Sequence, residues 1–149
     1  MNVVKLDKKI IIGISVRTTN RHETNPKTAR IGALYRRFDA AVPVDYKNGA
    51  RVYGVYYNYE SDASGEYSLL AGSDRIDETI ASTLEQVTIA SGSYVVFEAK
   101  GEVPEIIIET WGKIWNYFAA KDAPHKRAYT TDFEYYKSQN EVDIYIAVK

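Results

Sequence analysis

The sequence contains no cysteine in its 149 residues. Disulfide bonds, thiolate metal sites, thiol nucleophiles and cysteine-based redox switches are therefore excluded. The absence also fits a reducing compartment, and we expect a cytoplasmic protein.

Long hydrophobic runs are absent as well. The apolar run at residues 10–16 is only seven residues long and is followed by Arg17. A run of this length is typical of a β-strand, whereas an export signal would add a cleavage site of small residues and a membrane span would need about 20 apolar residues. We expect neither, and hence no membrane association.

Histidine is scarce, because His22 and His125 are the only two and both lie in loop-like sequence. Such positions are typical of surface histidines, so neither predicts a haem ligand. The sequence also has no zinc-ligand cluster, phosphate-binding loop or nucleophile elbow. We expect no cofactor and no metal site.

Neither sign of charge dominates, since the net charge is −1. Residues 1–51 carry 11 basic and 4 acidic side chains, and residues 52–149 carry 8 and 16. The basic side chains of the first third are scattered rather than clustered, which is typical of a solvated surface. We expect no direct contact with nucleic acid.

Tyrosine, by contrast, is abundant and supplies 13 of the 19 aromatic residues. Its ring has a flat apolar face and a polar tip, which suits a binding surface, although tyrosine is also common in β-sheets. Tyr53 and Tyr56 lie in an apolar segment of the first half, and Tyr46 lies in the loop before it. We regard all three as candidate ligand contacts.

Two helices are predicted by apolar spacing, one over residues 26–41 with Asn25 as its N-cap and one over residues 104–120. Short apolar or alternating segments predict the strands. These strands cover residues 9–18, 52–59, 66–72, 84–97 with a break near residue 92, 129–137 and 142–148.

The order of these elements repeats along the chain. Residues 9–72 read as strand, helix, strand, strand, and residues 93–148 read the same way. We therefore predict a single α+β domain over residues 1–149, built from a duplicated βαββ unit with pseudo-twofold symmetry and antiparallel sheets that are each crossed by a helix. A cleft where the two halves meet would be a natural ligand site.

The last predicted hairpin places an acid, Glu134, among aromatic residues. If residues 138–141 connect the two strands, Glu134 lies opposite Tyr145 on a mixed face, while Phe133 and Tyr135 share an apolar face with Ile144. Two interpretations of the mixed face are open. It is either exposed to water, or it lines the cleft, where a carboxylate beside aromatic rings would bind an organic cation.

Nearly the whole chain resembles the GyrI-like, or AraC-type effector-binding, multidrug-binding domains. The resemblance rests on the helix PEIIIETWGKIWNYF, the strand motif FEYY, the closing strand VDIYIAVK and the earlier strand VYGVYYN, and it spans residues 9–148. It implies a domain that binds small amphipathic, often cationic, compounds between its halves, with Glu134 facing the ligand. The candidate ligand-binding residues are Glu134, Trp111, Tyr145, Tyr53, Tyr56, Tyr46 and Tyr136.

Members of this family often follow a DNA-binding helix-turn-helix domain. Only about eight residues precede the first predicted strand here, so we expect a stand-alone member. Such a protein could sequester a toxic compound, act as a sensor that reports to a separate transcription regulator, or block a partner such as DNA gyrase.

Hydrolysis is the alternative function. The resemblance extends to GyrI-like proteins that hydrolyse reactive small molecules with a glutamate and a tyrosine, and Glu134 with Tyr145 or Tyr136 would be that pair here. A carboxylate in an apolar cleft can serve as a general base. We nevertheless expect binding rather than catalysis.

Overall fold

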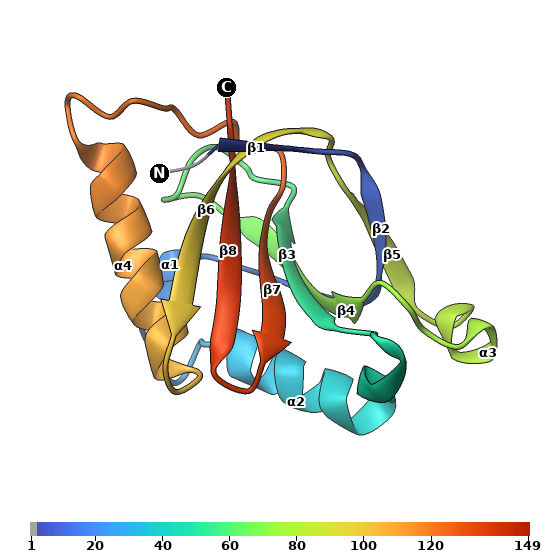
Figure 1. The fold of residues 1–149 in the computed structure, drawn as a ribbon. Helices are drawn as coiled ribbons and strands as arrows, with labels where there is room; N and C mark the ends of the chain where they lie inside the picture. Colours follow the sequence, from blue (N-terminus) through green and yellow to red (C-terminus); the bar gives the residue numbers. More distant parts are fainter. Residues whose placement is uncertain (1–2) are drawn as a thin grey trace.

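Eight strands form one antiparallel sheet in the computed structural model, which describes residues 3–149 (Figure 1). The strands are β1 (Val3–Leu6), β2 (Lys9–Thr18), β3 (Val52–Tyr57), β4 (Tyr67–Ser73), β5 (Glu85–Ile89), β6 (Gly92–Lys100), β7 (Asp132–Ser138) and β8 (Glu141–Val148). The helices are α1 (Asn20–Glu23), α2 (Ile31–Ala41), the 3-10 turn η1 (Tyr46–Asn48), α3 (Glu78–Ala81) and α4 (Glu105–Ala119). The α+β class is confirmed, but the expectation of separate sheets is wrong, because β3 pairs with β7 and joins the two halves.

The strands follow the order β1-β6-β8-β7-β3-β4-β2-β5 across the sheet. In the first predicted half β4 lies between β2 and β3, and in the second half β8 lies between β6 and β7. The two halves therefore have the same connectivity. Their origin by duplication stays a prediction. Strand β1, which the sequence analysis missed, pairs with β6 at one end of the sheet. Only two residues separate β1 from β2 near the other end, so the sheet must curl until its ends lie close together.

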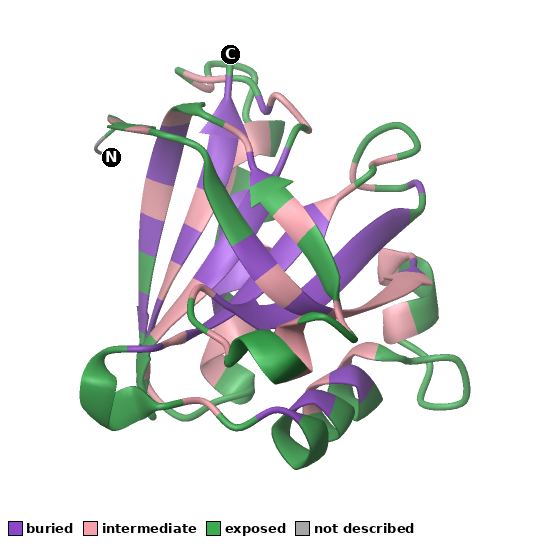
Figure 2. Ribbon diagram, turned by 90° about the vertical axis from the view of Figure 1, so that its right-hand side faces the viewer, coloured by how far each residue is buried: buried purple, intermediate pink, exposed green. Residues whose placement is uncertain are grey.

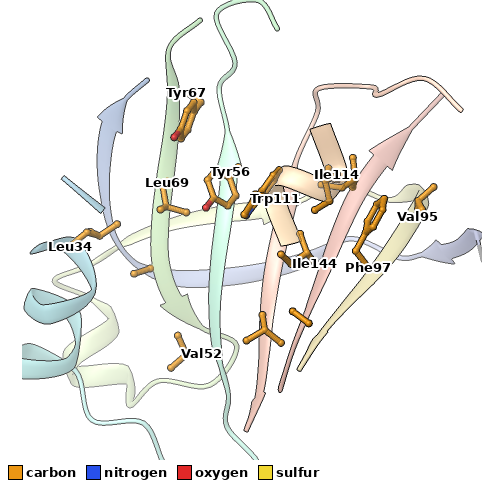
Figure 3. Packing of buried hydrophobic residues seen from close by; sticks show 14 of the residues in the cluster. Leu34, Val52, Tyr56, Tyr67, Leu69, Val95, Phe97, Trp111, Ile114 and Ile144 are labelled. Atoms are coloured by element: carbon orange, nitrogen blue, oxygen red, sulfur yellow. The ribbon is translucent and has the colours of Figure 1, made fainter. Parts of the chain in front are cut away.

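The two long helices cover one face of the sheet, which we call the helix face. Helix α2 packs on β2 and β4, and α4 packs on β6, so the central strands β3 and β7 lie between the helices. Leu34 and Ile114 are fully buried in one cluster with Leu69 and Ile144 (Figure 3). None of the helices in residues 3–149 is long and apolar enough to cross a membrane.

The opposite face of the sheet carries a second, largely aromatic cluster. Phe133 and Tyr145 stack with their ring centroids 4.5 Å apart, and Tyr53 and Tyr94 pack against Phe133. Burial is therefore concentrated in the central strands, whereas the outer surfaces of the helices are exposed (Figure 2). Because both faces of β3 and β4 are covered, the apolar residues of these two strands form runs instead of alternating with polar ones.

Helix α2 begins five residues later than predicted, at Ile31 instead of residue 26. Asn25 does accept a hydrogen bond from the backbone N–H of Lys27 at 2.9 Å, but it caps only a turn. The carboxylate of Glu23 instead accepts from the backbone N–H groups of Arg30 and Ile31, at 2.9 and 3.1 Å. An acid from α1 therefore satisfies the free donors at the start of α2.

The predicted register of the last hairpin is wrong over most of its length. Ser138 and Glu141, which were expected in the connection, instead pair as strand residues, and a β-bulge between Tyr136 and Ser138 shifts the pairing by one residue. Glu134 consequently lies opposite Ile144. A one-residue shift moves every side chain of a strand to the other face relative to its partner. The carboxylate thus shares the helix face with the apolar side chains of β8.

Two isoleucines of α4 provide a matched test of this packing. We expect Ile114→Ala to lower the free energy of unfolding by about 2–5 kcal/mol, because Ile114 is fully buried and its loss leaves a cavity. Ile108 is 70% exposed, so Ile108→Ala should change the free energy of unfolding by less than about 0.5 kcal/mol. Urea unfolding of both variants measures the difference, and equal costs would contradict the placement of α4.

Candidate ligand-binding cleft

A cleft of about 1360 Å³ lies between α2 and α4, above the central strands β3 and β7. Its wall and floor residues include Ile31 and Tyr35 of α2, Trp111 and Trp115 of α4, Tyr56 of β3 and Glu134 of β7. The volume is larger than a typical pocket for a small molecule. The helices therefore leave room for a bulky ligand over the middle of the sheet.

The carboxylate of Glu134 is buried at the floor of the cleft, with only 1% of the residue exposed. Its Oε1 atom accepts hydrogen bonds from the hydroxyls of Tyr136 and Tyr35, at 2.9 and 3.2 Å. Its Oε2 atom accepts from the Tyr56 hydroxyl and the Trp111 indole N–H, both at 2.8 Å. Four neutral donors thus satisfy the acid, and none of them carries a compensating positive charge.

Gly54 makes room for one of these donors. It lies opposite Glu134 in the β3–β7 pair, and a Cβ atom at this position would overlap the Tyr35 hydroxyl and lie 3.0 Å from Oε1 of Glu134. A glycine inside a strand is expected where another group must approach the backbone closely. Only this glycine allows Tyr35 to reach across from α2 to the carboxylate.

The tyrosines around the acid remain neutral donors at ordinary pH. Burial, followed by the negative charge of Glu134, raises the pKa of Tyr35, Tyr56 and Tyr136 well above the usual value for tyrosine. A tyrosinate beside a buried carboxylate would add a second uncompensated negative charge. The hydroxyl protons therefore stay available for the hydrogen bonds to Glu134.

Four of the seven candidate residues meet at one point, since Glu134 bonds Trp111, Tyr56 and Tyr136. The Tyr56 and Trp111 rings pack edge to face with their centroids 5.1 Å apart (Figure 3). Tyr46 also lines the cleft, but at the rim, where 55% of it is exposed.

The other two candidates, Tyr53 and Tyr145, do not line the cleft. Tyr53 is an odd number of positions from Tyr56 along β3, so its side chain lies on the opposite face, paired with Tyr135. Tyr145 lies opposite Phe133, because the β-bulge shifts the register of the hairpin. The structure therefore does not form the predicted pair of Glu134 with Tyr145.

The cleft residues that the sequence did not identify include Tyr35, Tyr59 and Arg127. Tyr35 lies on the apolar stripe of α2, where its polar tip, together with the glycine in VYGVYY, was a signal of a close contact. Arg127 lies in the segment between α4 and β7, which has no periodic pattern. Nothing in its sequence context indicated that it is buried.

Arg127 and Asp132 form a buried ion pair beside the acid site. Nη2 of Arg127 lies 2.7 Å from Oδ2 of Asp132, and the two side chains are 6% and 0% exposed. The Tyr59 hydroxyl and the backbone N–H of Ala147 also donate to the carboxylate of Asp132. This pair is neutral overall, so Glu134 supplies the uncompensated charge of the inner cleft.

The mouth of the cleft is apolar and exposed. Ile108 is 70% exposed and Trp115 is 42% exposed, and both lie on the side of α4 that lines the cleft with Trp111. Their helical spacing alone would be equally typical of core residues. Large apolar side chains left open around a concave site are typical of a binding surface.

A family model described as Cass2, integron-associated effector binding protein, matches residues 2–148. The chain belongs to this effector-binding family. The match confirms the resemblance to GyrI-like effector-binding domains.

Relatives match over nearly their whole length. The Cass2 integron cassette protein from the mobile metagenome of Vibrio cholerae is 45% identical, with a TM-score of 0.89, over 99% of this chain and 95% of that one. YobU of Bacillus subtilis (strain 168), named as a presumed transcriptional regulator, is 30% identical over 99% of this chain and 97% of its own. The fold of SAV2435, solved with tetraphenylphosphonium bound, is similar with a TM-score of 0.73 at 19% identity, over 99% and 93% of the two chains.

The close approach of Tyr35 to Gly54 can be tested by a double-mutant cycle. We expect Gly54→Ala to lower the free energy of unfolding by about 1–3 kcal/mol, because the new methyl group displaces the Tyr35 hydroxyl. In a Tyr35→Phe background the hydroxyl is absent, so Gly54→Ala should lower the free energy of unfolding by less. Urea unfolding of the four proteins measures both values. An equal cost in both backgrounds would mean that Tyr35 does not lie over Gly54.

Proposed function

We propose that this protein binds bulky, amphipathic organic cations in the cleft and acts as a sensor or sequestering module in the cytoplasm. One observation carries the proposal: Glu134 is a buried carboxylate whose hydrogen-bond partners in residues 3–149 are all neutral. Its charge is therefore held in place without being neutralised. A ligand cation would supply the missing positive charge.

The arrangement suits a cation that cannot form hydrogen bonds. In a quaternary phosphonium or ammonium ion, apolar groups surround the charge and keep it several ångströms from any partner. Tyrosine and tryptophan side chains cover Glu134, so the attraction between its carboxylate and the ligand cation must also act over several ångströms. Two opposite charges roughly 6 Å apart attract by about 3 kcal/mol at an effective dielectric constant of about 20.

The rings around the acid would supply the remaining affinity. Tyr56 and Trp111 are fixed at the floor by their bonds to Glu134, and Trp115 and Ile108 offer open apolar surface at the mouth. Flat aryl groups of a ligand would bury this surface, and the ring faces attract cations. Because none of these contacts requires a precise geometry, several differently shaped cations should bind.

The comparisons support the same class of ligand. SAV2435, which shares the fold, holds tetraphenylphosphonium in its solved structure. The family is described as effector-binding, and YobU is named as a presumed transcriptional regulator. We therefore propose that ligand binding is reported to a separate regulator.

Replacing the acid by its neutral isostere tests the proposal. We expect Glu134→Gln to weaken tetraphenylphosphonium binding by about 30-fold, or about 2 kcal/mol, because the attraction to the carboxylate is lost. The variant should fold, since the Tyr35 and Tyr136 hydroxyls can turn and accept from the amide. Both tryptophans of the chain line the cleft, so quenching of intrinsic fluorescence measures the affinity.

Two controls separate charge from shape. Tetraphenylborate matches the phosphonium in shape but is an anion, so it should bind wild-type protein at least about 100-fold more weakly. The same substitution at the exposed Glu98 of β6, Glu98→Gln, should leave phosphonium binding unchanged. Equal affinity for the two ions, or an equal effect of both substitutions, would rule out a charge-selective site at Glu134.

A further inference from the structure

Arg127 is a buried cation that lines the same cleft. Its guanidinium carbon lies 4.4 Å from the ring centroid of Tyr129 and 5.9 Å from the rings of Tyr59 and Trp111. The rings stack on a group whose charge is already balanced by Asp132. The side chain is thus held in one position from several sides.

One hydrogen-bond donor of Arg127 is buried without a partner in the part of the chain that the structure describes. A guanidinium has five N–H donors, yet among residues 3–149 its side chain donates only from Nη2, to Asp132. The Nε atom is buried and has no hydrogen-bond partner in this part of the chain. Buried donors are nearly always satisfied, so an unpaired one needs an explanation. A bound ligand would provide it by bringing an acceptor to Nε as the rings that cover the guanidinium move aside.

The unpaired donor lies at a defined place relative to the acid. Asp132, the partner of Arg127, is two residues before Glu134 on the same face of β7, which separates their backbones by about 7 Å. Trp111 lies between the two charged groups, because its N–H bonds Glu134 and its ring packs near Arg127. A ligand that covers Trp111 would therefore reach both groups at once.

We infer that the cleft selects organic cations that carry a hydrogen-bond acceptor, such as a carbonyl oxygen, about 7 Å from the positive centre, the acceptor binding to Arg127. This inference rests on the proposed function, in which Glu134 attracts the cationic centre. The acceptor satisfies the unpaired guanidinium donor, and a charged donor forms the stronger class of hydrogen bond.

Two matched phosphonium ions test the inference. (4-Carbamoylphenyl)triphenylphosphonium carries a carbonyl oxygen roughly as far from phosphorus as Asp132 lies from Glu134, and (4-methylphenyl)triphenylphosphonium lacks it. We expect wild-type protein to bind the carbamoyl compound about tenfold more tightly in isothermal titration calorimetry. Arg127→Lys keeps a charge beside Asp132 but removes Nε, so the ratio of the two affinities should fall to within about twofold.

A second readout needs no variant. The Nε–Hε resonance of Arg127 in wild-type protein should move downfield with the carbamoyl compound and much less with the methyl compound, while that of the exposed Arg37 stays in place. Equal affinities with an unmoved Arg127 resonance would overturn the inference and leave the proposed function standing. If neither phosphonium binds, the proposed function itself fails.

Discussion

The hydrogen bonds to one buried carboxylate organise the centre of this protein. Burying an acid is costly unless donors replace the water that it loses. Glu134 receives its donors from Tyr35 of α2, Tyr56 of β3, Trp111 of α4 and Tyr136 of its own strand. Both long helices and both central strands are therefore tied to a single side chain, and this set of contacts fixes how the halves face each other.

The same contacts explain why the cleft stays open. The polar tips of the rings point at the acid, so their apolar surfaces are left to form the floor and walls. Fully apolar side chains in these positions would gain by closing over one another, whereas each ring here is held by its bond to Glu134. Keeping the cleft open leaves apolar surface in water at the mouth, where Trp115 and Ile108 are exposed. Only a ligand or partner can cover this surface. Negative charge and uncovered apolar surface thus occur together.

Much of this arrangement could be predicted from sequence, and its limits have physical causes. Apolar spacing located α4 closely and indicated seven of the eight strands, and the FEYY motif singled out Glu134. The sequence could not show which side chains of the last hairpin share a face, because one extra residue in β7 shifts the pairing with β8 by one position. Both faces of these strands are apolar enough to hide that shift. Four-residue β1 is too short to show a pattern, and Arg127 lies outside any periodic element.

We propose that the uncompensated charge of Glu134, and not the apolar mouth, determines where a cation binds. A crystal structure of the complex with tetraphenylphosphonium tests it most directly. We expect the phosphorus atom to lie deep in the cleft, with Glu134 as its nearest carboxylate and the hydrogen bonds from Tyr56 and Trp111 intact. A phosphonium seated at the mouth against Trp115 and Ile108, nearer to the rim acids Glu23 or Asp39 than to Glu134, would show that the charge of Glu134 does not position the cation.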